Sequence, residues 1–262
     1  MIDMFNQPFH LTTMSPWPII TSFNIFNLLS SSIYLFNYNN INCILFMLMN
    51  IILSSYQWWR DTIRESLHQG TYTKSIYSNL KFGMILFITS EVMFFFSFFW
   101  AYFHMFLSPS MELGMNWPPM NIITFNPFNI PLLNTIILIA SSMSLTWTHH
   151  STLNQMNFPM IISMMTTLIL GITFTIFQMY EYTHANFSIN DSIYGSMFFL
   201  LTGFHGLHVL IGTIFLMTNF IRMLKNHFSK INHFSMEASI WYWHFVDVVW
   251  LFLFITLYWL IN

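Results

Sequence analysis

The stretch GMILFITSEVMFFFSFFWAYFH (residues 83–104) decides the fold class of this chain. It is long and apolar, and Glu91 is the only Asp, Glu, Lys or Arg between Phe82 and Met111. A helix rises about 1.5 Å per residue, so Glu91 lies roughly 15 Å along the helix from Lys81. This is the midplane of a hydrocarbon core about 30 Å thick. A carboxylate at that depth must be protonated, paired or hydrated, and it suggests a functional site.

The composition extends this conclusion to the whole chain. Its 262 residues are 55% hydrophobic and only 6% charged, against about 25% charged in an average soluble domain. The sequence therefore predicts an all-α, polytopic membrane protein. The single cysteine, Cys43, excludes an intramolecular disulfide and a cysteine metal site, and leaves the redox compartment undetermined. A net charge of −2 argues against nucleic acid as a partner.

The first ten residues, MIDMFNQPFH, contain Asp3 but no Lys or Arg. They therefore resemble neither a signal peptide nor an Arg-rich transit peptide. Phe and Met are abundant, with 31 and 21 residues, whereas Gly occurs only eight times. Together these features favour translation from an AT-rich organellar genome.

Windows of about 20 apolar residues predict seven transmembrane helices. Polar, charged or Pro-rich segments separate these helices, and the longest of these segments surrounds Trp117-Pro118-Pro119. The predicted spans lie near residues 16–36, 41–60, 79–106, 128–150, 157–181, 192–223 and 234–260.

The charged loops test this count. Seven spans place all seven basic residues in two loops on the same side: Arg60, Arg64, Lys74, Lys81, Arg222, Lys225 and Lys230. The opposite loops carry Glu112, Asp191 and the nearby Glu181, and no basic residue. The positive-inside rule therefore predicts that the N-terminus and both basic loops face the matrix or cytoplasm. An error of one span between residues 82 and 221 would divide the basic loops between the two sides.

Polar groups at membrane depth are the candidate site. They are Glu91 with Thr89 and Ser90, His205 with His208, His244 with Asp247, and His149 with His150. A spacing of three puts both members of a pair on one helix face. Three functions fit this set: contacts that hold helices together, proton transfer along a Glu–His–Asp chain, and a haem iron bound by His244 with His205 or His208.

Glu91 needs a partner that is not Lys or Arg, because no basic residue lies within any predicted helix core. Neutral donors, water or a protonated histidine remain. His208, near mid-depth, is the first candidate and His205 the second. Removal from water disfavours a charged carboxylate, so we expect Glu91 to be protonated and to donate a hydrogen bond.

Residues near the predicted membrane boundary suggest lipid contacts and helix packing. Tryptophans beside a basic residue are typical of an interfacial belt, and basic residues at this boundary also bind anionic head groups. The predicted lipid-binding residues are Trp58, Trp59, Arg60, Arg64, Arg222 and Lys225. Gly203, Gly206 and Gly212 are expected to allow close approach of helices.

Three histidines fall on the predicted matrix side, namely His10, His227 and His233. An unperturbed histidine titrates near pH 6.5, at roughly neutral pH. We therefore predict that these residues buffer protons at the surface.

Nine segments indicate a family. They are SPWP (15–18), QWWRDTIRE (57–65), GMILFITSEVMFF (83–95), FFWAYFH (98–104), WPP (117–119), PLLNT (131–135), TWTHHS (146–151), TGFHGLHVLIGT (202–213) and WYWHFVDVVWLFLF (241–254). In this order they resemble subunit III of mitochondrial cytochrome c oxidase over nearly the whole chain.

The resemblance implies one membrane domain (1–262), with a first helix pair (16–60), a group of five (79–260) and a phospholipid cleft between them. It implies a non-redox core subunit of the oxidase, a complex that reduces O2 to water with electrons from cytochrome c and pumps protons. The subunit would stabilise subunit I, its main contact, and support proton uptake. It would lie in the mitochondrial inner membrane, with its N-terminus in the matrix and its C-terminus in the intermembrane space.

The resemblance also bears on the site residues. Haem a, haem a3, CuA and CuB are expected in partner subunits, with no metal and no catalytic residue in this chain. Glu91 matches the family's buried carboxylate, and Asp247 matches its acidic partner in helix seven. The chain departs from the common family pattern at Tyr72, Met115, Asn116 and His184, and Tyr72 replaces a lipid-facing histidine. The alternative is a free-standing haem-binding or proton-translocating membrane protein.

Overall fold

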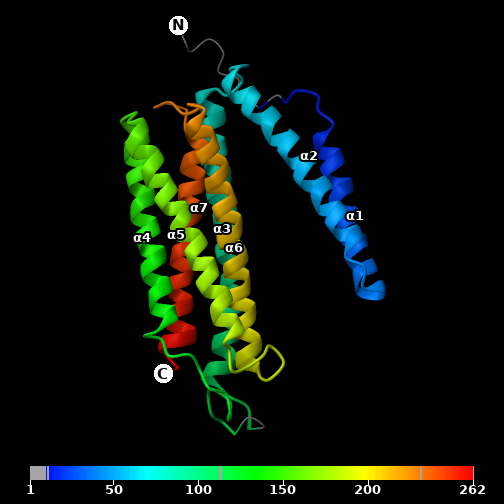
Figure 1. The fold of residues 1–262 in the computed structure, drawn as a ribbon, viewed down its shortest axis with the longest axis vertical. Helices are drawn as coiled ribbons and strands as arrows, with labels where there is room; N and C mark the ends of the chain where they lie inside the picture. Colours follow the sequence, from blue (N-terminus) through cyan, green and yellow to red (C-terminus); the bar gives the residue numbers. More distant parts are fainter. Residues whose placement is uncertain (1–9, 11, 112–113, 231, 262) are drawn as a thin grey trace. The chain divides into compact units, whose positions relative to one another are not determined.

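The computed structural model describes residues 10, 12–111, 114–230 and 232–261. These residues form seven α-helices and no strand (Figure 1). The helices are α1 (Trp17–Tyr38), α2 (Asn42–Leu67), α3 (Lys74–Leu107), α4 (Ile130–Leu153), α5 (Asn157–Thr183), α6 (Ile193–Leu224) and α7 (Phe234–Leu253). A π-helical segment, η3 (Phe254–Trp259), continues α7. The prediction of an all-α chain with seven helices is confirmed.

Six of the seven helices have the length and apolar composition of a membrane span. The exception is α2, predicted to span at 41–60, because Asn50 and Gln57 lower its hydropathy. The helix also continues to Leu67, past the predicted end, and α3 begins at Lys74 instead of residue 79. Arg and Glu are good helix formers, so a charged sequence can stay helical outside the apolar layer.

Contacts divide the chain into two compact units, residues 1–80 and 81–262. The first unit is a helix pair. Asn39 ends α1 in the left-handed conformation, with φ of 52°, and its N–H donates to the Leu35 carbonyl at 2.8 Å. Further along the pair, Asn24 Nδ2 of α1 donates to Ser54 Oγ of α2 at 3.1 Å. The single membrane domain predicted from the sequence stays a prediction.

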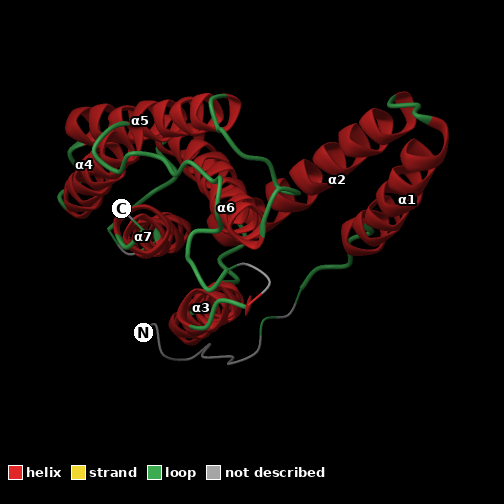
Figure 2. Ribbon diagram, turned by 90° about the horizontal axis from the view of Figure 1, so that it is seen from below, coloured by secondary structure: helices red, strands yellow, loops and turns green. Residues whose placement is uncertain are grey.

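The second unit contains a four-helix bundle. In it α4 contacts α5 and α7, and α6 contacts the same two helices (Figure 2). In the most apolar part of the span that begins with α7, 61% of the residues are buried, whereas in that of α3 only 6% are. Among the helices of this unit α7 is therefore the most buried, and long side chains attach α3 to the outside of the bundle.

The bundle closes around Trp243 of α7, which is fully buried and donates its Nε1–H to Ser141 Oγ of α4 at 2.9 Å. A Cβ on Gly212 would lie 3.0 Å from its ring, so the predicted close packing at this glycine is confirmed. A Cβ on Gly206 would lie 2.7 Å from Oε1 of the buried Gln178 side chain of α5. The prediction is wrong for Gly203, where the nearest atom would be 3.9 Å away.

Candidate functional site

Glu91 meets His208 between α3 and α6. Glu91 Oε2 lies 2.8 Å from His208 Nε2, which confirms the predicted first partner. The Glu91 side chain is 24% exposed and that of His208 9%. The other ring nitrogen of His208, Nδ1, lies 2.7 Å from the Phe204 carbonyl. A carbonyl can only accept, so Nδ1 carries a hydrogen.

This geometry fixes what the pair can do chemically. With Nδ1 protonated, Nε2 either accepts a hydrogen bond from a neutral Glu91 carboxyl or, as part of an imidazolium, donates one to the carboxylate. Both arrangements contain one shared proton and no net charge. The pair therefore satisfies a buried carboxyl without Lys or Arg.

Aromatic rings surround the pair. The rings of Phe94, Phe95, Tyr242 and Phe245 lie 5.0 to 6.3 Å, centroid to centroid, from the imidazole of His208. An apolar surrounding strengthens a hydrogen bond and raises the cost of leaving either partner unpaired. The same rings attach α3 to α6 and α7.

His205 is fully buried one helical turn before His208. Its Nε2 donates to the Val246 carbonyl of α7 at 3.3 Å. The rings of Phe174 and Trp250 pack against it, with centroids 5.5 and 5.1 Å away. His205, the second candidate partner of Glu91, therefore links α6 to α7 instead.

His244 links α7 to α4. Its Nδ1 lies 2.8 Å from Ser142 Oγ of α4 and 3.7 Å from Asp247 Oδ2, one turn later on α7. Asp247 is buried. The predicted polar residues therefore form successive links from α3 to α6, from α6 to α7 and from α7 to α4. The histidines proposed as a haem pair each have a partner of their own, so the geometry favours helix contacts.

The predicted lipid-binding residues divide between the two units. In the first unit, Arg60 and Arg64 approach Asp61 Oδ1 at 3.2 and 3.6 Å, and Trp17 Nε1 donates to Asp61 Oδ2 at 2.6 Å. Trp58 and Trp59 beside them are exposed. In the second unit, Arg222 donates to Ser235 Oγ and lies over the Phe228 ring, while Lys225 follows α6 and is exposed.

The three predicted surface histidines have different environments. His10 is exposed, with Nε2 3.9 Å from Glu65 Oε2. His227 is half-buried. His233 is only 7% exposed, so its prediction as a surface group is wrong. The charge pattern gives the side of the membrane, but the packing of α7 against its neighbours determines burial.

Sequence reasoning missed two polar features. Glu181, predicted to lie near an acidic loop, is only 1% exposed at the end of α5. Glu112 of the same predicted set lies outside the described residues.

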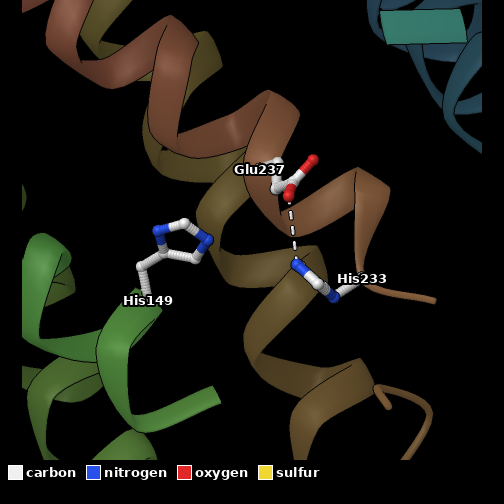
Figure 3. Close-up of side chains that lie close together, drawn as sticks. All are labelled: His149, His233 and Glu237. Carbon is white, nitrogen blue, oxygen red and sulfur yellow. Dashed lines mark ion pairs between the residues drawn. The ribbon is translucent and has the colours of Figure 1, made fainter. Parts of the chain in front are cut away.

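The second feature is the cluster of His149, His233 and Glu237, whose ligand atoms lie within 4.8 Å of one another (Figure 3). Its only sequence signal is the spacing of four between His233 and Glu237.

Comparison with known proteins gives a consistent result. The profile of the family described as cytochrome c oxidase subunit III matches residues 7–261. Cytochrome c oxidase subunit 3 of Drosophila melanogaster is 56% identical over 256 residues, covering 97% of each chain. The subunits of Anopheles gambiae and Pelomedusa subrufa are 53% and 52% identical, covering at least 97% of each chain.

Proposed function

The chain belongs to the cytochrome c oxidase subunit III family, and from this premise we propose that it is a non-redox core subunit that braces subunit I. Membership makes the chain part of an oxidase complex, with other oxidase subunits as its partners, in a mitochondrial membrane. The links made by Glu91, His205 and His244 are the observation that carries the bracing role. Through these links, polar side chains at membrane depth hold α3, α6, α7 and α4 together.

The chemistry of the complex is assigned to its other subunits in this proposal. Haem a, haem a3, CuA and CuB, held by partner subunits, would supply the reduction of O2 by cytochrome c electrons and the coupled proton pumping. The chain itself would hold subunit I in place and take no part in the redox chemistry. The bonds of His208 Nε2 to Glu91 and of His205 Nε2 to the Val246 carbonyl support this division, because they engage a ring nitrogen in both histidines that could pair with His244 at a haem. His10 and His227 stay predictions as proton buffers near an uptake site.

The proposed topology places the N-terminus in the matrix and the C-terminus in the intermembrane space, across the inner membrane. Two contacts support it. Lys81 Nζ lies 2.6 Å from Glu237 Oε2, so the start of the apolar part of α3 and the start of α7 share one end of their unit. On the predicted opposite side, the Ser188 N–H donates to Asp191 at 2.7 Å and holds the pKa of that carboxyl below its usual range. Asp191 is therefore negative at neutral pH, as expected of the acidic side.

Assembly tests the proposed function. We expect the chain, solubilised from mitochondria in a mild detergent, to migrate with a much larger complex that has haem absorption. The physical reason is that a chain with 6% charged residues, and in this proposal no redox centre of its own, functions by packing against a partner subunit in the membrane. Native electrophoresis with in-gel spectra makes the measurement. A monomeric chain without any haem protein attached would contradict the proposal.

We also propose a phospholipid contact at the basic end of α2. The side chain of Arg64 is 58% exposed, whereas that of Arg60 is 35% exposed and lies against Asp61. Because Trp17 also bonds this carboxylate, Arg64 is freer than Arg60 to reach a phosphate. A basic residue at an anionic membrane surface contributes about 1 kcal/mol, or roughly fivefold in affinity.

Arg64→Ala is therefore expected to reduce the anionic phospholipid that co-purifies with the oxidase. Arg64→Lys keeps the charge and should retain most of the lipid. Lys230→Ala removes an exposed cation from the other unit and serves as the control. Mass spectrometry of the retained lipid gives the measurement. Equal lipid content in Arg64→Ala and the wild-type complex would count against this contact.

A further inference from the structure

A polar cluster lies where α4 ends and α7 begins (Figure 3). His149 comes from the last turns of α4, His233 is the N-cap residue of α7, and Glu237 follows one turn later. Each offers one ligand atom, and these atoms lie within 4.8 Å of one another. We propose that the cluster binds a single divalent transition-metal ion, and that zinc is the best match.

The tautomer of His233 is the strongest argument. Its Nδ1 lies 3.1 Å from the Ser229 carbonyl, which can only accept, so Nδ1 carries a hydrogen. The lone pair of Nε2 then faces Glu237 Oε1 at 3.0 Å. If the imidazole is neutral, two acceptors this close, on a histidine that is 7% exposed, need a metal ion or a proton between them. A histidine that donates Nδ1–H to a carbonyl while Nε2 binds a metal is the usual outer-shell arrangement.

His149 provides the third ligand. Its Nε2 is buried and has no hydrogen-bond partner among the described residues. Its ring centroid lies 6.0 Å from that of His233. The two imidazoles therefore lie next to each other, one bearing an unused nitrogen and the other a lone pair facing a carboxylate.

The donor set selects the ion. Two imidazoles and one carboxylate, with water in a fourth position, form a tetrahedral zinc site of the His2Glu type. Magnesium and calcium prefer oxygen ligands, so two nitrogen donors disfavour them. Zn–N bonds of about 2.0–2.1 Å bring ligand atoms to roughly 3.3 Å from one another, so small rotations of the three side chains complete the site.

Lys81 pairs with Glu237 but leaves one carboxylate oxygen available to a metal ion. Its Nζ lies 2.6 Å from Glu237 Oε2, the oxygen that is not directed at His233. The ammonium therefore neutralises one side of the carboxylate while Oε1 stays available. The Lys81 side chain is 42% exposed and can move toward solvent when a dication binds.

Zinc titration of the full chain tests the proposal. The chain is purified in detergent, treated with EDTA and dialysed against Zn²⁺, and the bound metal is measured by mass spectrometry. We expect one zinc per chain. His149→Gln, His233→Gln and Glu237→Gln should each weaken binding by at least about 100-fold, more than the loss expected from an outer-shell change. Lys81→Met should bind zinc at least as tightly as the wild type.

His150→Gln is the matched control, because His150 adjoins His149 but is exposed and contacts Asn154. It should leave zinc binding unchanged. Equal losses in His150→Gln and His149→Gln, or no stoichiometric binding, would overturn the site and indicate surface binding or an ordinary histidine–carboxylate ion pair. If a variant fails to fold, zinc X-ray absorption of the wild-type chain decides. Two imidazoles and a carboxylate support the site, and fewer than two imidazoles refute it.

Discussion

Replacement of Glu91 by alanine is expected to lower the free energy of unfolding of the chain by about 1–3 kcal/mol. The change removes the group 2.8 Å from His208 Nε2 and leaves that nitrogen unpaired among aromatic rings. It also removes the polar link from α3 to α6. Unfolding of the purified chain in detergent by added SDS provides the measurement. Ser90→Ala, which deletes a neighbouring exposed hydroxyl on the same helix, should change the free energy by less than about 0.5 kcal/mol.

Glu91→Gln separates a structural role from proton transfer. The amide keeps the shape of the side chain and can donate to the lone pair of His208 Nε2, so assembly and oxygen reduction should be retained. The proton-to-electron stoichiometry of the variant oxidase should equal that of the wild type. Normal assembly with abolished pumping would make Glu91 a proton relay and contradict the bracing role.

The His208 contact can be confirmed by a double-mutant cycle. If Glu91 and His208 act as one pair, the effects of Glu91→Ala and His208→Ala should not add. The expected coupling is about 0.5–2 kcal/mol, the range found for polar pairs between membrane helices. Additive losses would mean that each residue acts through other contacts.

Part of this site could be predicted from the sequence because polar residues are rare within the predicted membrane spans. A lone carboxyl at mid-depth must find one of few polar partners, and His208 was among them. Side-chain spacing also paired His244 with Asp247. The sequence could not predict that His205 would bond the Val246 carbonyl, because backbone acceptors have no residue-specific signal.

The fold, too, could be predicted from the sequence only in part. Apolar windows predicted seven helices, since a membrane requires long runs of such residues. They misjudged α2, where helix propensity continues the helix through charged residues to Leu67. The burial of His233 and Glu181 was also missed. Hydropathy gives depth along a span, whereas burial depends on which helix covers the residue.

A large packing effect is expected at Gly171 on α5. A Cβ there would lie 2.8 Å from Trp243 Cη2 and 2.9 Å from Thr213 Cγ2. Trp243 cannot retreat easily, because it is fully buried and its Nε1 donates to Ser141. Gly171→Ala should therefore push α5 away from its neighbours and destabilise the chain by about 1–3 kcal/mol. Unfolding in detergent by SDS measures the loss.

Gly203→Ala is the matched control for this prediction. Its added Cβ would have only the Tyr182 hydroxyl nearby, at 3.9 Å. Alanine also favours a helix over glycine by about 1 kcal/mol, so this variant should be as stable as the wild type or more stable. Two identical changes should thus have opposite signs, because only Gly171 lies against the buried indole. Equal stability of the two variants would show that Trp243 can be displaced, and that close helix approach does not depend on this glycine.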